Sequence, residues 1–286
     1  MKGGLYKMKP MEIKNAINPQ YASSLTTEGL RQEFLISGLF IPGEQKLVYT
    51  YFDRMIVGGI CPRKTTSIQE SREITGMDYL LERREMGIIN IGSRGTVNLD
   101  DKEYVLDYKD GLYIGMGTRD LQFSSENPKA LAKFYLVCTI AHKTYPTKKI
   151  EFCQIAPIHL GSAEGASKRI LYKYVVPENV KSSQLTMGMT AVEPGNVWNT
   201  IPSHTHARKT EVYLYFDIKE DAVVFQIIGE PKETRHIVVR NEEALIVPGW
   251  SIHSGVGTSN YTLIWGMAGE NQTFTDMDEV PIKMLR

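Results

Sequence analysis

The chain has 286 residues, enough for one large or two ordinary domains, and its composition is that of an ordinary globular protein. Lysine plus arginine equals aspartate plus glutamate, at 33 each, so no general attraction to nucleic acid or to an anionic membrane is expected. The 3 cysteines, Cys61, Cys138 and Cys153, are too widely spaced for a disulfide framework, which favours a reducing compartment. No apolar run reaches the roughly 18 residues of a membrane span. Residues 1–10 lack the apolar core of a signal peptide, so a cytoplasmic location is expected.

The N-terminal segment, residues 1–30, predicts the start of one short helix. Thr26-Thr27-Glu28 has the residue types of a helix N-cap, and a helix from here would carry Leu30, Phe34 and Leu35 on one apolar face. Beyond it the chain consists of short apolar runs broken by Gly, Pro, Asn and Asp, which predict strands. In the first block the runs are 46–52, 87–91, 104–106 and 112–114, with one helix expected at 128–134.

A second strand-rich block follows a small, polar segment at 161–167, which predicts a domain boundary. Its predicted strands are 172–176, 211–216, 222–228, 236–240, 244–247 and 261–267. So many short strands predict an all-β sandwich or barrel with a few short helices. We therefore expect a β domain at residues 31–165 and a second β domain at residues 166–286.

The two blocks look like copies of one unit. Residues 103–117 can be laid over residues 235–249, since both read as strand, acidic turn, strand and Gly-containing turn. The first copy contains no His-x-His, and Thr118-Arg119-Asp120 stands where a histidine would be needed. We expect the first copy to be free of metal and to serve structure or assembly.

Three of the 6 histidines and one glutamate form a candidate metal site. His204 and His206 are two residues apart, so on a strand they point to one face, with Cα atoms about 6.5–7 Å apart. Glu211 has the opposite parity, which a turn at 207–210 would correct by starting a new strand. His253 would arrive from a third strand, after a Pro-Gly turn. Imidazoles and a carboxylate suit a divalent transition metal, although a polar pocket without metal remains an alternative.

These residues resemble the motifs of the cupin superfamily, a glycine, His-x-His and Glu, followed by a Pro-x-Gly turn and a histidine. Here Gly195 precedes the His-x-His by a longer spacer than usual, and the turn is Pro248-Gly249. Longer strings resemble the 5-keto-4-deoxyuronate isomerase family within that superfamily. The strings are 83–92, 112–118, 132–136, 141–142, 198–217 and 248–255, within a resemblance that spans roughly residues 20–286.

The resemblance implies a duplicated cupin fold and a zinc-dependent ketol-isomerase of pectin and glycosaminoglycan breakdown that works as a homohexamer. It carries the zinc ligands over onto His204, His206, Glu211 and His253, with one Zn²⁺ per subunit, although another divalent metal would also fit. The implied reaction converts 5-keto-4-deoxyuronate to 3-deoxy-D-glycero-2,5-hexodiulosonate through an enediol or enediolate. Four protein ligands usually mark a closed structural zinc site, so catalysis would require a higher coordination number.

The proton-transferring and substrate-binding groups are harder to assign from sequence. Tyr213 and Tyr215 share the face of Glu211 by strand alternation, and Glu193 is a further candidate base. Arg208 or Lys209 is expected to bind the substrate carboxylate, because both lie between the ligands. The other candidates for contact with the sugar are a glutamine within an apolar strand and two flanking tryptophans, Gln226, Trp198 and Trp250.

Two other functions stay open. A cupin oxygenase would use Fe(II) with the same ligand types, and oxygen uptake would reveal it. A metal-stabilised sugar-binding module would have no turnover at all, and the polar residues around the ligands speak against it. The expected partner is a small uronate, with no nucleic acid and no membrane.

Overall fold

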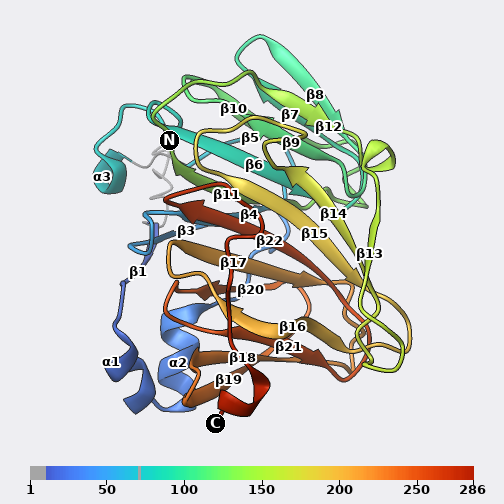
Figure 1. The fold of residues 1–286 in the computed structure, drawn as a ribbon. Coiled ribbons are helices and arrows are strands. Elements are labelled where there is room, and N and C mark those ends of the chain that lie inside the picture. The colour runs from blue at the N-terminus through green and yellow to red at the C-terminus, as the bar shows by residue number, and fades with distance from the viewer. Residues whose placement is uncertain (1–10, 70–71) are drawn as a thin grey trace.

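Short strands form two pairs of stacked sheets, as the apolar runs predict (Figure 1). The computed structural model describes residues 11–69 and 72–286. The N-terminal decapeptide, where the absence of a signal peptide was predicted, lies outside the described residues. The prediction of an all-β fold with short helices is confirmed.

The first half of the chain forms an inner and an outer sheet. In spatial order the 7-stranded first inner sheet contains β1 (Glu12–Lys14), β3 (Gln45–Thr50), β4 (Ile56–Ile60), β11 (Phe134–Ile140), β6 (Arg84–Asn90), β9 (Gly111–Ile114) and β12 (Lys148–Ile150). The 4-stranded first outer sheet contains β5 (Thr66–Ser67), β10 (Leu121–Ser125), β7 (Gly95–Leu99) and β8 (Lys102–Leu106).

The second half repeats this arrangement. Its 7-stranded second inner sheet contains β13 (Ile158–Leu160), β14 (Arg169–Val175), β15 (Thr186–Val192), β22 (Thr262–Gly269), β17 (Lys209–Phe216), β20 (Glu243–Val247) and β2 (Leu35–Ile36). Its 5-stranded second outer sheet contains β19 (Glu233–Val239), β18 (Val224–Glu230), β21 (His253–Gly257), β16 (Trp198–Thr205) and β23 (Asp278–Glu279).

The strand order supports the predicted duplication. The inner-sheet series β3-β4-β11-β6-β9 corresponds to β14-β15-β22-β17-β20, and the outer-sheet series β5-β10-β7-β8 corresponds to β16-β21-β18-β19. The overlay of residues 103–117 on 235–249 pairs the correct strands but is one residue out of register. Leu112 faces the interior of the first barrel, whereas Ala244, its partner in that overlay, faces the other half. A strand alternates its faces, so a shift of one residue restores the match.

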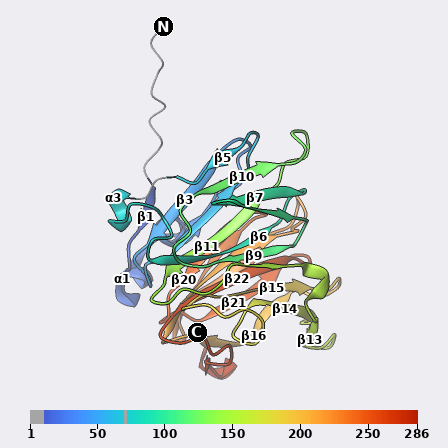
Figure 2. The same ribbon diagram turned by 90° about the horizontal axis from the view of Figure 1, so that it is seen from above.

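An edge strand from the start of the chain lies in the second half. β2, near the N-terminus, pairs with β20 of the second half, and β12, which precedes the second repeat, pairs with β9 of the first half. β13 also belongs to a second-half sheet and lies across the molecule from helix α1 (Pro19–Ser24) in both views (Figures 1 and 2). By sheet membership, β2 and β13 thus lie with the second half, although the predicted boundaries place them in the first domain.

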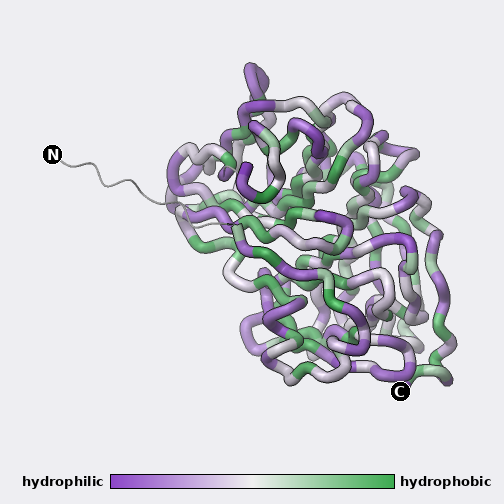
Figure 3. Tube along the Cα trace, turned by 90° about the vertical axis from the view of Figure 1, so that its left-hand side faces the viewer, coloured by the Kyte–Doolittle hydropathy of each residue, from purple (hydrophilic) through white to green (hydrophobic). Residues whose placement is uncertain are grey.

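Three apolar clusters hold these layers together. One fills the first barrel, one fills the second barrel, and the third lies between the two inner sheets. Val212, Leu214 and Phe216 belong to the cluster between the halves, while Tyr213 and Tyr215 point into the second barrel, as strand alternation predicts. Hydrophobic stretches run through the interior of the trace, and hydrophilic residues gather at many of the outer turns (Figure 3).

Helices are few in the described part of the chain. Helix α2 (Thr27–Phe34) begins at the predicted cap, where the Thr26 hydroxyl accepts a hydrogen bond from the Gly29 amide, and it buries Leu30 and Phe34. The helix predicted at 128–134 is wrong, because this segment forms a turn with a bridge between Asn127 and Ala130 before β11. The remaining helical segments are α3 (Arg72–Thr75), η1 (Phe152–Gln154) and η2 (Ile282–Met284). Among the described residues, no helix is long and apolar enough to cross a membrane.

Candidate metal centre and substrate cavity

Three strands of the second barrel bring the predicted ligands together. His204 on β16 lies opposite His253 on β21, and His206 follows in the turn after β16. The turn at 206–208 leads into β17, from which Glu211 points into the barrel. Glu211 Oε2 lies 3.3 Å from His206 Nε2 and 3.2 Å from His253 Nε2. Ligand nitrogens of the three histidines lie within 4.8 Å of one another.

The chemistry of this cluster fits a divalent ion. Donor atoms bound about 2.1 Å from one tetrahedral ion are about 3.4 Å apart, close to the separations from Glu211. Both ring nitrogens of His253 are buried and make no hydrogen bond of normal geometry with the described residues, although Nε2 lies 3.2 Å from Glu211 Oε2. A buried polar atom without a partner costs about 1–3 kcal/mol, which a metal bond would offset. Among the described residues, His204, His206 and His253 form a group of ligand-type side chains close enough together to hold one ion, and Glu211 lies beside them.

Carbonyl oxygens orient two of the imidazoles. His206 Nδ1 lies 3.0 Å from the Asp276 carbonyl oxygen, and His204 Nδ1 lies 3.3 Å from that of Pro202. With the proton on Nδ1, each ring donates to its carbonyl and leaves Nε2 as the ligand atom. The C-terminal segment therefore takes part in holding the site.

Burial and proximity set the charge states of the cluster. Burial lowers the pKa of His253 to about 3, and burial together with the charge of His206 lowers the pKa of His204. Burial alone would raise the pKa of Glu211, but the hydrogen bond from His206 and the nearby imidazoles hold it at about 2. Burial opposes protonation of His206 as well, yet the hydrogen bond and charge of Glu211 raise its pKa. Ligation of a metal would require an ionised carboxylate and neutral imidazoles, which the low pKa values of Glu211 and His253 favour and the raised pKa of His206 opposes.

Of the two predicted tyrosines, the structure brings one to the cluster. The Tyr213 hydroxyl donates to Glu211 Oε2 over 2.9 Å, and this residue lines the cavity described below. Tyr215 lies deeper in the barrel and donates instead to the amide oxygen of Gln226. Tyr215 and Gln226 are both buried and satisfy each other, so neither is placed to contact a substrate.

The two predicted carboxylate-binding cations already have protein partners. Arg208 Nε lies 2.8 and 3.0 Å from the two carboxylate oxygens of Asp276, and Nη2 also reaches Asp278. Lys209 is buried and donates from Nζ to the Thr273 carbonyl oxygen over 2.6 Å. Both residues hold residues 271–280, which we name the C-terminal strap, and neither lines the cavity.

The remaining candidates lie away from the metal cluster. Glu193 follows β15, is partly exposed, and has Oε1 3.7 Å from His159 Nδ1. Trp250 packs edge-on against Phe34 under the N-terminal helices, with ring centroids 6.2 Å apart. Trp198 begins β16 and pairs with Val256. The cavity beside the histidines is not lined by any of these three.

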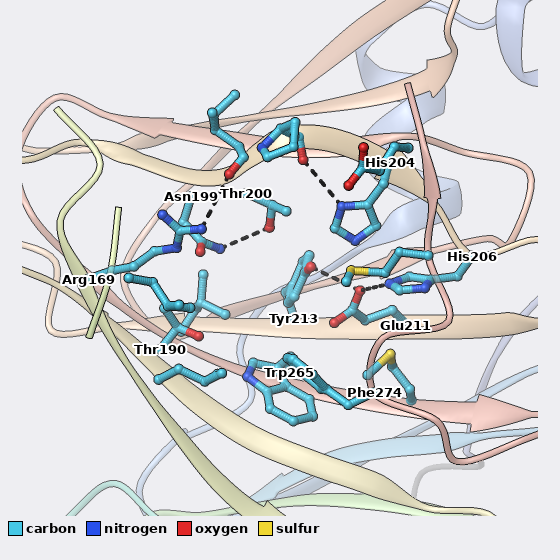
Figure 4. A pocket seen from close by; sticks show the side chains of 18 residues that line it. Arg169, Thr190, Asn199, Thr200, His204, His206, Glu211, Tyr213, Trp265 and Phe274 are labelled. Atoms are coloured by element: carbon cyan, nitrogen blue, oxygen red, sulfur yellow. Dashed lines mark hydrogen bonds and ion pairs between the residues drawn. The ribbon is translucent and has the colours of Figure 1, made fainter. Parts of the chain in front are cut away.

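A cavity of about 200 Å³ opens beside the cluster in the second barrel. Figure 4 shows His204, His206 and Glu211 at one end, Tyr213 in the middle, and Arg169, Asn199 and Thr200 at the other end. Apolar side chains cover much of the wall between the ends, namely Leu171, Leu263, Trp265, Met267, Phe274 and Met277. The other lining residues are Leu160, Thr190, Ile201, Pro202 and Glu279.

Arg169 and Glu279 are the two charged lining residues that the sequence did not single out. Arg169 lies three residues before a predicted strand, and Glu279 lies near the C-terminus within an acidic stretch, so each resembles an ordinary surface residue in the sequence. The pairing of Glu279 with His204 across β16 and β23 has no local signal, because β23 is only 2 residues long.

Comparison with known proteins gives consistent results across the chain. Residues 40–282 match the KduI/IolB family. A protein from Caldicellulosiruptor bescii called 4-deoxy-L-threo-5-hexosulose-uronate ketol-isomerase is 55% identical over 276 residues, covering 96% of this chain and 100% of the relative. Proteins of the same name from Halalkalibacterium halodurans and Escherichia coli are 51% and 49% identical, again over 96% of this chain and 100% of each relative.

Solved structures share the fold at low sequence identity. An IolB-like protein from Salmonella typhimurium aligns with a TM-score of 0.62 at 12% identity, covering 96% of this chain and 94% of that one. The oxalate decarboxylase of Lactobacillus farciminis aligns with a TM-score of 0.58 at 10% identity, covering 87% and 88%. These similarities concern the fold alone, which is the duplicated cupin fold.

Proposed function

Because this chain belongs to the KduI/IolB family, we propose that it is a metal-dependent ketol-isomerase that converts 4-deoxy-L-threo-5-hexosulose uronate to 3-deoxy-D-glycero-2,5-hexodiulosonate. The observation that carries the proposal is the convergence of three buried imidazoles and one buried carboxylate beside a cavity. The relatives that bear this activity as their name match nearly the whole chain, including the ligand-bearing strands.

The reaction moves hydrogen between two neighbouring carbons. The carbon that carries the hydroxyl loses a proton, and the aldehyde carbon gains one. The hydroxyl proton passes to the former aldehyde oxygen, so an aldehyde and an alcohol become an alcohol and a ketone with no net loss of atoms. An enediol or enediolate lies between them, and its formation requires a base and a way to stabilise negative charge on oxygen.

We propose that His204, His206, Glu211 and His253 hold the ion, and that the ion is zinc. Imidazole and carboxylate ligands suit zinc, although other divalent metals accept the same set. When bound, such an ion supplies positive charge that favours the enediolate. Ligation by the chain requires neutral imidazoles and an ionised carboxylate, and the low pKa values of His253 and Glu211 support those states.

Tyr213 and Glu279 are the proposed proton-handling residues. Burial raises the pKa of Tyr213 well above its usual value, so this hydroxyl stays protonated and acts as a donor. Its hydrogen bond to Glu211 orients that carboxylate at the cavity wall. Two of the described carboxylates line the cavity, Glu211 and Glu279, and Glu279 is the one that is not a proposed ligand. It therefore takes the role of base that the sequence led us to expect of Glu193.

Metal analysis combined with an isomerisation assay tests this function. We expect about one metal ion per chain in the purified protein, and loss of at least about tenfold in metal affinity for His206→Ala and His253→Ala. Chelation should abolish turnover while circular dichroism stays nearly unchanged, because the barrel core does not depend on the ion. Wild-type metal content in both variants would contradict the ligand assignment. Oxygen consumption without isomerisation would favour the Fe(II) oxygenase, and metal content without any turnover would favour a sugar-binding module.

We infer further, from the family resemblance, that the chain works as a homohexamer in the cytoplasm in the breakdown of pectin and glycosaminoglycans. The first half has the supporting role in this arrangement, since the proposed ligands all lie in the second half. Analytical ultracentrifugation at micromolar concentration tests the assembly, and a monomer would contradict it.

A further inference from the structure

Arg169 is a cation at the cavity wall without an acidic partner. It is the first residue of β14, and its guanidinium donates to two carbonyl oxygens, those of Ser167 over 2.9 Å and Ile201 over 3.3 Å. Within the described residues, no carboxylate lies at ion-pair distance from it. Burial lowers the pKa of Arg169, so the protein surroundings alone leave its charge poorly compensated. A guanidinium has five N–H donors, so several remain to receive a bidentate anion.

We propose that Arg169 binds the carboxylate of the substrate, so that the acid end of the sugar lies at Arg169 and the aldehyde end lies at the histidines. This assignment rests on the proposed function and specifies the orientation of the bound substrate in the cavity. It replaces Arg208 and Lys209, which the aspartates and a carbonyl of the C-terminal strap already engage.

The separation of the two ends fits an open six-carbon chain. Arg169 contacts the carbonyl of Ile201, and His204 lies three residues further along β16, which is at most roughly 10 Å of strand. An extended six-carbon chain spans roughly 6–7 Å, so the length of the substrate and this backbone spacing are of the same order. Figure 4 shows Arg169 and the histidines on opposite sides of Tyr213.

The charges of the cavity fix the direction of the substrate. Glu279, the lining carboxylate that is not a proposed ligand, lies at the histidine end, where it would repel a substrate carboxylate, whereas Arg169 lies at the other end. In the opposite orientation, the substrate carboxylate and its neighbouring ketone would lie at the proposed metal ligands. The Arg169 guanidinium would then face the uncharged aldehyde. The wall between the ends includes the apolar side chains of Leu263 and Met267. They suit the deoxygenated carbon of the substrate better than they would suit a carbon that carries a hydroxyl.

Comparison of the acid substrate with its neutral amide isolates the role of the charge. Steady-state kinetics of the wild type, Arg169→Met and Arg169→Lys should be measured with each compound at full metal occupancy. We expect Arg169→Met to raise KM for the acid about 10- to 100-fold, because the variant loses a charge-assisted hydrogen bond to the substrate. KM for the amide should change less than about threefold, and Arg169→Lys should recover part of the preference for the acid. Lys168→Gln removes a neighbouring exposed cation and should leave KM for both substrates unchanged.

Each outcome decides between the alternatives. If Arg169→Met and Arg169→Lys raise KM for the acid and for the amide by the same factor, Arg169 only holds the two backbone carbonyls, and the proposal is overturned. If Arg169→Met fails to fold, the acid-to-amide ratio of Arg169→Lys gives the same decision. If the wild type isomerises neither compound, the proposed function fails. In that case calorimetric binding of the acid and the amide to the wild type and Arg169→Lys still tests the anion site.

Discussion

Glu279 and Glu193 carry the same functional group in different surroundings. Glu279 lies across from His204 in the β16–β23 pair and lines the cavity, while Glu193 lies outside it near His159. A base acts only as the bond to hydrogen breaks, so its loss lowers kcat more than it changes KM.

We therefore expect Glu279→Gln to lower kcat by about 10²- to 10⁴-fold with little change in KM. The matched substitution Glu193→Gln should leave both constants near their wild-type values. Steady-state kinetics on metal-saturated enzyme checks both. The reverse pattern, a slow Glu193→Gln and a normal Glu279→Gln, would restore the assignment made from the sequence.

The C-terminal strap is the element that completes the site from outside the barrel. Its Asp276 carbonyl accepts from His206, its Phe274 and Met277 line the cavity, and β23 pairs with β16. Arg208 ties the strap to the turn that carries His206 through its ion pairs with Asp276 and Asp278. We infer that Arg208 acts on the proposed metal ligand His206 through Asp276, as a positioning residue.

Loosening the strap should weaken metal binding before it affects the fold. We expect Arg208→Met to lower metal affinity about tenfold, as changes around metal ligands commonly do, with turnover largely restored by excess metal. Arg208→Lys should restore part of the affinity, and Lys283→Met, an exposed cation beyond the strap, serves as the control. Competition with a chelator gives the metal dissociation constants. Equal constants for Arg208→Met and the wild type would show that the ion pair does not position His206.

At the scale of the whole molecule, a buried carboxylate joins the two halves. Glu85 of β6 is 0% exposed and accepts a hydrogen bond of 2.6 Å from the Tyr113 hydroxyl. It also accepts from three consecutive amides of the second half, at 2.7 Å each, those of residues 183–185. These amides have no strand partner to replace it, because they lie in the loop that leads into β15.

Removing this carboxylate should destabilise the assembled halves. We expect Glu85→Ala to lower the free energy of unfolding by about 2–5 kcal/mol, because it leaves buried N–H groups without an acceptor. Glu85→Gln keeps one acceptor oxygen and should cost less. The exposed Glu103→Ala should stay within about 0.5 kcal/mol of the wild type. Urea unfolding followed by fluorescence measures these differences, and an unchanged midpoint for Glu85→Ala would contradict the role of Glu85.

The sequence by itself determined the features that depend on local pattern. Turn residues between apolar runs predicted the strands and the all-β fold, and the Thr26 cap predicted helix α2. Strand alternation placed Tyr213 on the face of Glu211, which the 2.9 Å hydrogen bond between them bears out. The two-residue spacing of His204 and His206, with a turn expected before Glu211, also selected residues that the fold brings together, because both are local patterns that need no knowledge of distant contacts.

Only the tertiary structure decided which polar groups share the cavity and which satisfy one another. Arg169 and Glu279 are 110 residues apart by number and reach the same cavity because β14 and β23 border it from different sheets. Arg208 lies beside the proposed ligands in the sequence, yet its guanidinium forms ion pairs with Asp276 and Asp278. The sequence order cannot separate these cases, since an ion pair depends on which strands and loops pack side by side. That choice is made by burial of the apolar faces across the whole chain rather than by the charged residues themselves.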